Sequence, residues 1–139
     1  MPVKSHTFTL STKGFSNVLD ITGEVNGAIK KSGLRDGIAC VFVPGSTAGV
    51  TTIEMESGVV EDLRQAIERM APQNIPYAHD ARWGDGNGFS HVRAALLGAG
   101  LSVPFTGGRL RLGTWQQLVL IDFDNRSRRR EVFVQMMGE

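Results

Sequence analysis

A stretch rich in glycine and proline over residues 71–88, together with the residues directly after it, concentrates side chains that can move protons or bind cations. These are His79, Asp80, Asp85, Asn87 and His91. A neutral imidazole accepts a proton near neutral pH, and a neighbouring carboxylate orients it or raises its basicity. The same residue types bind divalent cations. The spacing favours neither role over the other, and a structural role as turn caps is equally compatible with it.

A second polar group follows an apolar run that is closed by Pro44. The corner Pro44-Gly45-Ser46-Thr47-Ala48-Gly49 combines small residues with two hydroxyls, so its backbone N–H groups and side-chain oxygens can approach an anion such as phosphate. Many ordinary β-turns have the same composition, and that is the commoner interpretation. Glu54 shares a strand face with Thr52 and could be a general base, a cation ligand or a solvent-facing residue.

Arginine and tryptophan residues near the end of the sequence provide weaker signals. Ser127 is surrounded by Arg126, Arg128, Arg129 and Arg130. Charges on a hairpin most often form a solvated turn, although two of these arginines could reach a phosphate or a neighbouring subunit. Trp115, which precedes Gln116, could stack on a flat heteroaromatic ring, or it belongs to the core or to an interface.

Two further patterns argue against common kinds of site. Cys40 lies in the apolar run 38–43, so we expect a buried small hydrophobic residue rather than a nucleophile. The glycines at 86 and 88 do not form a dinucleotide-binding loop, because His91 occupies the third glycine position and no apolar strand precedes them. The sequence also has no phosphate-binding P-loop.

The elements that must position these residues follow from hydrophobic periodicity. Alternation predicts a strand over 4–11, and apolar residues at helical spacing predict helices over 17–31, stopped by Gly33, and over 59–70, ended by Pro72. The continuous run 38–43 predicts a strand covered on both faces, followed by a strand over 49–55. A loop over 71–88, a short helix over 90–97 and strands over 101–105, 110–112, 116–123 and 131–136 complete the chain. Two main helices among adjacent strands predict an α+β fold.

Length and composition limit the class of protein. A chain of 139 residues fits one domain spanning 1–139, since domains average about 150 residues. The hydrophobic fraction of 41% and charged fraction of 21% exclude a disordered chain. A net charge of +1 gives no field to attract nucleic acid or an anionic membrane.

The cysteine count and the apolar runs indicate the compartment. Cys40 is the only cysteine, so no intrachain disulfide can form, and a reducing cytoplasm is the natural setting. No apolar run approaches the about 20 residues that a membrane-spanning helix needs. The residues that begin the sequence, Met-Pro-Val-Lys-Ser-His, contain no apolar signal core. We therefore expect a soluble cytoplasmic protein.

Four stretches, in this order, resemble the YjbQ family, whose members are also described as secondary thiamine-phosphate synthase enzymes. They are PGSTAGVTTIE at 44–54, AHDARWGDGNGFSHVRAALLG at 78–98, GRLRLGTWQQLVLIDFD at 108–124 and QMMGE at 135–139. The resemblance covers nearly the whole chain, and the combination of SHVRAALLG with GTWQQ is specific.

The resemblance implies an α+β subunit with a large mixed or antiparallel sheet, assembled as a homotrimer. It also implies weak thiamine-phosphate synthase activity, in which hydroxymethylpyrimidine diphosphate condenses with a thiazole phosphate and pyrophosphate is released. Three positions depart from the family pattern. Gly45 stands where many members have the first residue of His-Thr-Thr, Ile53 replaces the Asn of an Asn-Glu pair, and Phe89 replaces the first His of His-Ser-His. They look like a subfamily pattern, because the neighbouring residues are intact.

On this resemblance we expect one small-ligand site at a subunit boundary, binding a small phosphorylated substrate and a divalent metal such as Mg or Zn. The expected catalytic residues are Glu54, His79, Asp80 and His91; the ligand-binding residues are Ser46, Thr47, Asn87, Arg93, Trp115 and Gln116; the metal ligands are His79 and His91. Two alternatives stay open. One is a metal-assisted phosphate-ester hydrolase, and the other is a non-catalytic trimer that binds a small anion or a metal. No nucleic-acid or membrane partner is expected.

Overall fold

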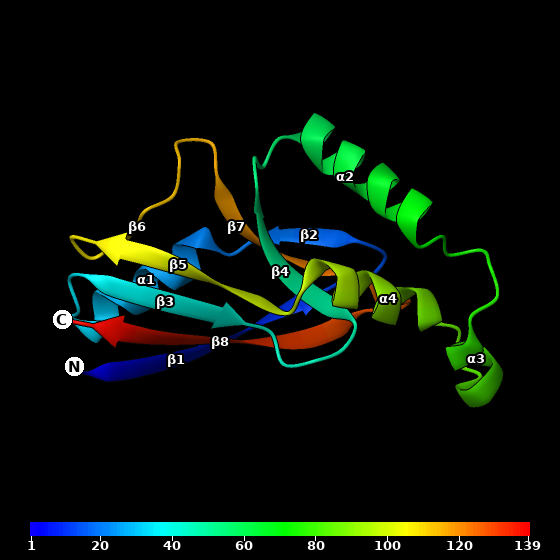
Figure 1. Ribbon diagram of the computed structural model, residues 1–139, viewed down its shortest axis with the longest axis horizontal. Helices are drawn as coiled ribbons and strands as arrows, with labels where there is room; N and C mark the ends of the chain where they lie inside the picture. Colours follow the sequence, from blue (N-terminus) through cyan, green and yellow to red (C-terminus); the bar gives the residue numbers. More distant parts are fainter.

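Two antiparallel sheets and four helices form the α+β fold of the computed structural model, which describes residues 1–139 (Figure 1). The larger sheet has the order β1 (Val3–Thr12), β8 (Arg128–Gly138), β3 (Gly37–Phe42), β5 (Gly100–Thr106) and β6 (Arg109–Leu110). The smaller sheet has the order β2 (Asn17–Asp20), β7 (Gln117–Asp122) and β4 (Ala48–Ile53). The helices are α1 (Thr22–Ser32), α2 (Ser57–Met70), α3 (Ala78–Trp83) and α4 (Gly88–Leu97). The expected α+β class is confirmed, with four helices where two main ones were expected.

Strand β7 lies between two apolar clusters and is the most deeply buried element. Leu118 and Leu120 belong to a core of 17 buried residues that also contains Val25 and Ile29 of α1. Alternate residues of the same segment, including Ile121 and Phe123, belong to a second cluster of 6 residues that involves α2 and α4. The continuous apolar run of this strand therefore reflects coverage on both faces.

Within one subunit, strand β3 does not have this double coverage, which differs from the prediction. Ala39 and Val41 are fully buried, whereas Ile38 and Phe42 are 49% and 44% exposed. Cys40 is exposed as well, which corrects its expected burial. Successive side chains of a strand point to opposite faces, and α1 covers only the inner face of this sheet.

Local structure departs from the sequence expectations at two further places. The helix expected over 17–31 divides into β2 and α1, because residues 17–20 pair with β7 in the register Val18 to Ile121. The loop expected over 71–88 contains the short helix α3. Gly33 ends α1 as expected, and α2 ends at Met70, two residues before Pro72. No helix is long and apolar enough to cross a membrane.

The helices α2, α3 and α4 gather at the end of the molecule opposite the two termini (Figure 1). Strand β4 connects this end to the sheets, because it pairs with β7. Its Val50 also donates a backbone hydrogen bond to the carbonyl oxygen of Gly98, the residue just after α4, 3.1 Å away. The corner before β4 is fixed in turn by the backbone bond from Phe123 N to Thr47 O, 2.9 Å. The corner around Ser46 is thus fixed beside α4 and the end of β7.

Candidate functional site

Two short helices bring the histidines together. His79 lies on α3 and His91 on α4, and their ring centroids are 4.4 Å apart with an interplanar angle of 38°. Asp80 Oδ1 accepts a hydrogen bond from Gly88 N, 2.8 Å, which joins the two helices. A Cβ at Gly88 would lie 2.6 Å from the Cβ of Tyr77, so only glycine permits this approach. The close junction of α3 and α4 therefore brings the two imidazoles together.

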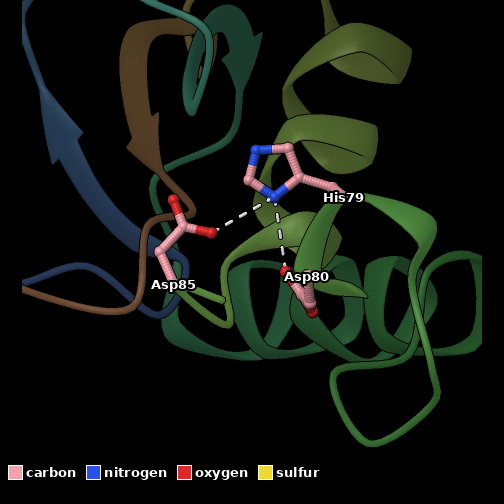
Figure 2. A group of neighbouring side chains, drawn as sticks. All are labelled: His79, Asp80 and Asp85. Atoms are coloured by element: carbon pink, nitrogen blue, oxygen red, sulfur yellow. Dashed lines mark hydrogen bonds and ion pairs between the residues drawn. The ribbon is translucent and has the colours of Figure 1, made fainter. Parts of the chain in front are cut away.

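His79 also contacts two carboxylates. Its Nδ1 lies 3.3 Å from Asp80 Oδ1 and 3.3 Å from Asp85 Oδ1 (Figure 2). The potential ligand atoms of these residues all lie within 4.8 Å of one another. The side chains of His79 and Asp85 are 29% and 51% exposed, so a solute can reach them. One imidazole with two carboxylates is a donor set that can hold a divalent cation or orient a general base.

A cleft of about 390 Å³ joins this group to the corner before β4. It is lined by Gly45, Ser46, Thr47, His79, Trp83, Asp85, Asn87, His91, Arg128 and Arg130. The hydroxyl-bearing corner and the histidine-bearing segment, far apart in the sequence, therefore meet in one polar cavity.

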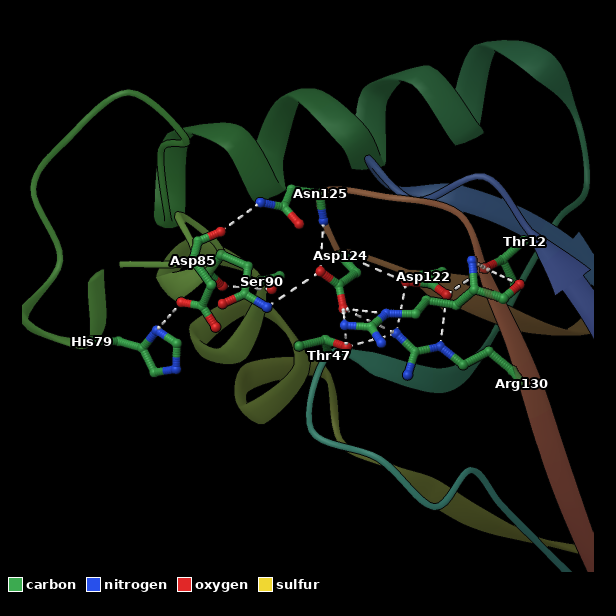
Figure 3. A network of polar contacts seen from close by, with 11 residues as sticks. Thr12, Thr47, His79, Asp85, Ser90, Asp122, Asp124, Asn125 and Arg130 are labelled. Carbon is green, nitrogen blue, oxygen red and sulfur yellow. Dashed lines mark hydrogen bonds and ion pairs between the residues drawn. The ribbon is translucent and has the colours of Figure 1, made fainter. Parts of the chain in front are cut away.

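A buried network of charges lies behind the cleft (Figure 3). Arg130 donates from Nε to Asp122 Oδ2 at 2.7 Å and from Nη2 to Asp122 Oδ1 at 2.9 Å. Its Nη2 also donates to Thr47 Oγ1, 2.6 Å away. Asp122 is fully buried, and its negative charge is compensated by this two-point contact with the guanidinium. The wall of the cleft is thus fixed by interlocked side chains from β7, β8 and the corner.

Asp124 is the second buried carboxylate of the network. It accepts hydrogen bonds from Thr47 Oγ1 at 2.9 Å and from Arg128 Nε at 2.9 Å. Burial by itself raises the pKa of Asp124, but the backbone N–H of Asn125, the Thr47 and Asn87 side chains and the Arg128 charge outweigh it, so the pKa is lowered. Asp124 therefore stays ionised at neutral pH.

Asn87 presents an unsatisfied acceptor. Asn87 is only 6% exposed, and its Nδ2 donates a hydrogen bond to Asp124 Oδ1, 3.3 Å away. Because a carboxylate only accepts, this contact fixes the orientation of the amide. Asn87 Oδ1 is the one fully buried side-chain oxygen or nitrogen without a hydrogen-bond partner. An unpaired buried acceptor in the cleft wall is suited to a donor or a cation.

The sequence-predicted site residues divide into two groups. Ser46, Thr47, His79, Asn87 and His91 line the cleft, and Asp80 contacts His79 beside it. Glu54 and Trp115 instead line a separate cleft of about 490 Å³ with Asp20, Met55, Glu56 and Gln117. Strand β4 separates the two clefts, and a strand of 6 residues spans roughly 20 Å. The single site expected from the sequence is therefore divided within one chain.

Arg93 and Gln116 have structural contacts outside the cleft. Arg93 donates from Nε to Ala71 O at 2.9 Å and from Nη1 to Ser16 Oγ at 3.3 Å, and it forms an ion pair with Glu68. It thus fixes α4 to the segment after α2. Gln116 donates to Thr52 Oγ1 at 3.0 Å and accepts from Gly113 N at 3.0 Å, which closes the turn before β7.

Several residues of the cleft, or of the network behind it, were given no role at the expected site. Trp83, Arg128 and Arg130 line the cleft, and Asp122 and Asp124 lie buried behind it. Asp85, noted in the sequence as a potential cation ligand, also lines the cleft. A signal for the buried pairs exists in the sequence, since Asp122 and Asp124 end a continuous apolar run and arginines follow directly. Charged residues at the end of a buried strand need partners, and the arginines are the nearest cations.

Comparisons with known proteins give one consistent result. A family model described as UPF0047 protein YjbQ-like matches residues 6–139. A UPF0047 protein from Methanothermobacter thermautotrophicus is 35% identical over 139 residues, covering 100% of this chain and 95% of that protein. The UPF0047 protein YugU from Bacillus subtilis is 32% identical over 133 residues, covering 95% of this chain and 98% of that protein.

Solved structures agree with the sequence comparison. The crystal structure of a YbjQ-like protein of unknown function from Sulfolobus solfataricus matches with a TM-score of 0.88 at 30% identity, covering 99% of this chain and 100% of that chain. An uncharacterised YjbQ/UPF0047 protein from Clostridium acetobutylicum matches with a TM-score of 0.87 at 34% identity, covering 95% of this chain and 99% of that chain.

Proposed function

This chain belongs to the YjbQ-like UPF0047 family, and we propose that its cleft catalyses group transfer on a small phosphorylated substrate, of the thiamine-phosphate synthase type. In that reaction hydroxymethylpyrimidine diphosphate condenses with a thiazole phosphate and releases pyrophosphate. The observation that carries the proposal is the convergence of the Ser46 corner, the His79–His91 pair and two arginines on one cavity.

The chemistry of the reaction sets what the cleft must do. The bond between the pyrimidine methylene carbon and the diphosphate oxygen breaks, and its electron pair leaves with pyrophosphate. The thiazole nitrogen lone pair forms the new C–N bond. Catalysis therefore consists of stabilising the leaving anion and holding the nitrogen in line with the carbon. The donors available for the anion are the Ser46 hydroxyl, the His91 imidazole and the guanidinium groups of the cleft wall.

We extend the proposal to a divalent cation held by His79, Asp80 and Asp85, with His91 adjacent. Four carboxylates, those of Asp80, Asp85, Asp122 and Asp124, lie at the cleft or directly behind it, and only two guanidinium groups are there to balance their charge. These belong to Arg128 and Arg130, which are engaged with Asp124 and Asp122. The charges of Asp80 and Asp85 thus have only His79 beside them. Asn87 lines the same cleft, and its buried Oδ1, which has no hydrogen-bond partner, adds an acceptor suited to a cation or a donor. A cation bound here supplies positive charge for a diphosphate.

We also propose the homotrimer as the assembled form, in the cytoplasm. The outer face of the larger sheet exposes Ile38, Cys40, Phe42 and Met137, from the adjacent strands β3 and β8. Exposed, contiguous apolar side chains on a sheet are typical of protein–protein contact. An exposed thiol fits a reducing compartment. A single site at a subunit boundary then requires that Glu54 and Trp115 of one subunit lie beside the cleft of another.

Metal-assisted hydrolysis of a phosphate ester is the second candidate, favoured by the half-exposed Asp85 beside His79, where water has free access. The test is to incubate the purified protein with each substrate alone and with both, in the presence of Mg²⁺, Mn²⁺ or Zn²⁺. Thiamine phosphate and pyrophosphate formed only with both substrates support the synthase. Inorganic phosphate released from one substrate supports the hydrolase, and saturable binding without product supports a non-catalytic binding protein.

A further inference from the structure

Arg130 combines deep burial with an unused nitrogen. Its side chain is only 10% exposed. Two of the three guanidinium nitrogens are engaged, Nε and Nη2 with Asp122 and Nη2 with Thr47 as well. The third, Nη1, makes no hydrogen bond within the protein and does not belong to the fully buried atoms without a partner. Nη1 is therefore open to the cleft that Arg130 lines.

The space beside this nitrogen is kept free by Gly45. A Cβ placed on Gly45 would lie 3.2 Å from Arg130 Nη1, and no other atom outside its chain neighbours lies within 4 Å of that position. Gly45 has a φ of +148°, a conformation that side-chain-bearing residues rarely adopt. A side chain at position 45 would therefore stand against Nη1. Gly45 leaves this nitrogen accessible from the cleft that both residues line.

The surrounding charges make this end of the cleft suitable for an anion. Asp122 is satisfied by the other two nitrogens of Arg130, and Asp124 by Arg128 and Thr47. The carboxylate of Asp85 contacts only His79 and lies on the opposite side of the network from Arg130 (Figure 3). A guanidinium N–H is a strong donor to phosphate oxygens. Ser46, exposed next to Gly45, adds a hydroxyl that makes no hydrogen bond within the protein.

We propose that Arg130 Nη1, together with the Ser46 hydroxyl and the gap at Gly45, forms the phosphate-anchoring subsite of the cleft, specific for a phosphate monoester or diphosphate. The assignment rests on the proposed function for the location of the substrate. Asp122 and Thr47 hold the guanidinium in place before the ligand arrives, so binding requires no rearrangement of Arg130. The substrate then extends from this anchor towards the His79 and Asp85 end.

Pyrophosphate is the probe for the first test, with its affinity measured by isothermal titration calorimetry. Arg130→Lys keeps a positive charge beside Asp122 but removes Nη1, and we expect the Kd to rise about tenfold or more. Arg129→Lys is the matched control, because Arg129 is exposed and donates to Thr9 on the neighbouring strand β1. Equal affinity of Arg130→Lys and the wild-type protein would overturn the proposal.

A measurement on the unmodified protein covers the case in which Arg130→Lys does not fold. The side-chain ¹⁵N–¹H signals of Arg130 should shift on titration with pyrophosphate, and signals that stay unchanged at saturation contradict the anchor. The two proposals can fail separately. Pyrophosphate binding through Arg130 without condensation removes the synthase function alone. Condensation with an unchanged KM in Arg130→Lys removes the anchor alone.

Discussion

The imidazoles of His79 and His91 lie 4.4 Å apart, centroid to centroid, although different helices carry them. The hydrogen bond from Gly88 N to Asp80 Oδ1 fixes the two helices together at 2.8 Å. Asp80 therefore has two roles, since the same Oδ1 also lies 3.3 Å from His79 Nδ1. The position of the His79 ring is thus coupled to the junction of the helices, and the pair acts as one preformed unit.

Replacement of His91 by alanine tests the role of this pair in turnover. Loss of one donor to a developing anion should lower kcat by on the order of 10²- to 10³-fold, as measured by product formation from both substrates. His6→Ala is the control, because His6 lies on β1 against Phe8, away from the cleft. A His91→Ala protein with wild-type kcat would remove His91 from the mechanism.

The cation proposal predicts a specific dependence on Asp85. Asp85→Asn removes one negative charge and weakens a carboxylate ligand, so the affinity for Mn²⁺ or Zn²⁺ should fall about tenfold or more in calorimetric titration. Asp62→Asn, at an exposed position on α2, should leave cation affinity unchanged. If a chelator leaves turnover intact and Asp85→Asn binds the cation normally, the proposed cation site is wrong.

The lowered pKa of Asp124 predicts how stability depends on pH. The ionised form is favoured in the folded state, so the stabilisation is fully present above the ordinary pKa of 3.8 and is lost as pH falls through the lower folded-state value. Asp124→Asn should therefore flatten the decrease in Tm as the pH falls below about 3.8. It should also lower the free energy of unfolding at neutral pH by about 2 kcal/mol.

Thermal unfolding followed by circular dichroism across this pH range provides the measurement. Glu131→Gln, an exposed position on β8, is the comparison and should follow the wild-type curve. An unchanged acid limb in Asp124→Asn would show that other carboxylates control the acid response.

Arg93 should affect stability more than catalysis. Arg93→Ala leaves Ala71 O and Ser16 Oγ without a donor, so we expect a loss of about 2–4 kcal/mol in chemical denaturation. Arg69→Ala, on the exposed side of α2, should change stability by less than about 0.5 kcal/mol. A tenfold rise in KM with unchanged stability would restore Arg93 as a ligand-binding residue.

The trimer proposal predicts that a charge on the outer sheet face dissociates the assembly. Phe42→Glu should shift the mass measured by light scattering from trimer to monomer, since burial of an unpaired carboxylate opposes association. Met70→Glu is the matched control: Met70 is 64% exposed but lies on α2, away from this face. A wild-type protein that is monomeric at micromolar concentration would refute the trimer.

The local parts of the candidate site are the ones that the sequence makes visible. Ser46, His79 and His91 were identified because their residue types and their glycine-rich surroundings are visible without knowledge of the fold, and all three line the cleft. Glu54 was assigned to the same site, yet it lies in another cleft beyond the far end of β4. A motif fixes which residues are near in sequence, but an extended strand carries its two ends far apart.

The parts that sequence could not predict depend on pairing between distant segments. Arg130 follows Asp122 by only 8 residues, but arginines in a hairpin ordinarily face solvent, and its burial also depends on Thr47 of the distant corner before β4. The predicted burial of both faces of β3 differs from the structure for a related reason. Its apolar composition is compatible with burial on both faces, but which faces are covered is decided by neighbouring elements and not by the strand itself.

Strand β8 pairs with both β1 and β3 and carries Arg128 and Arg130. Without this interior strand, β1 would lose its partner in the larger sheet and the buried Asp122 and Asp124 would lose their counter-ions. Any change that displaces β8 should therefore disturb the sheet and the wall of the cleft together.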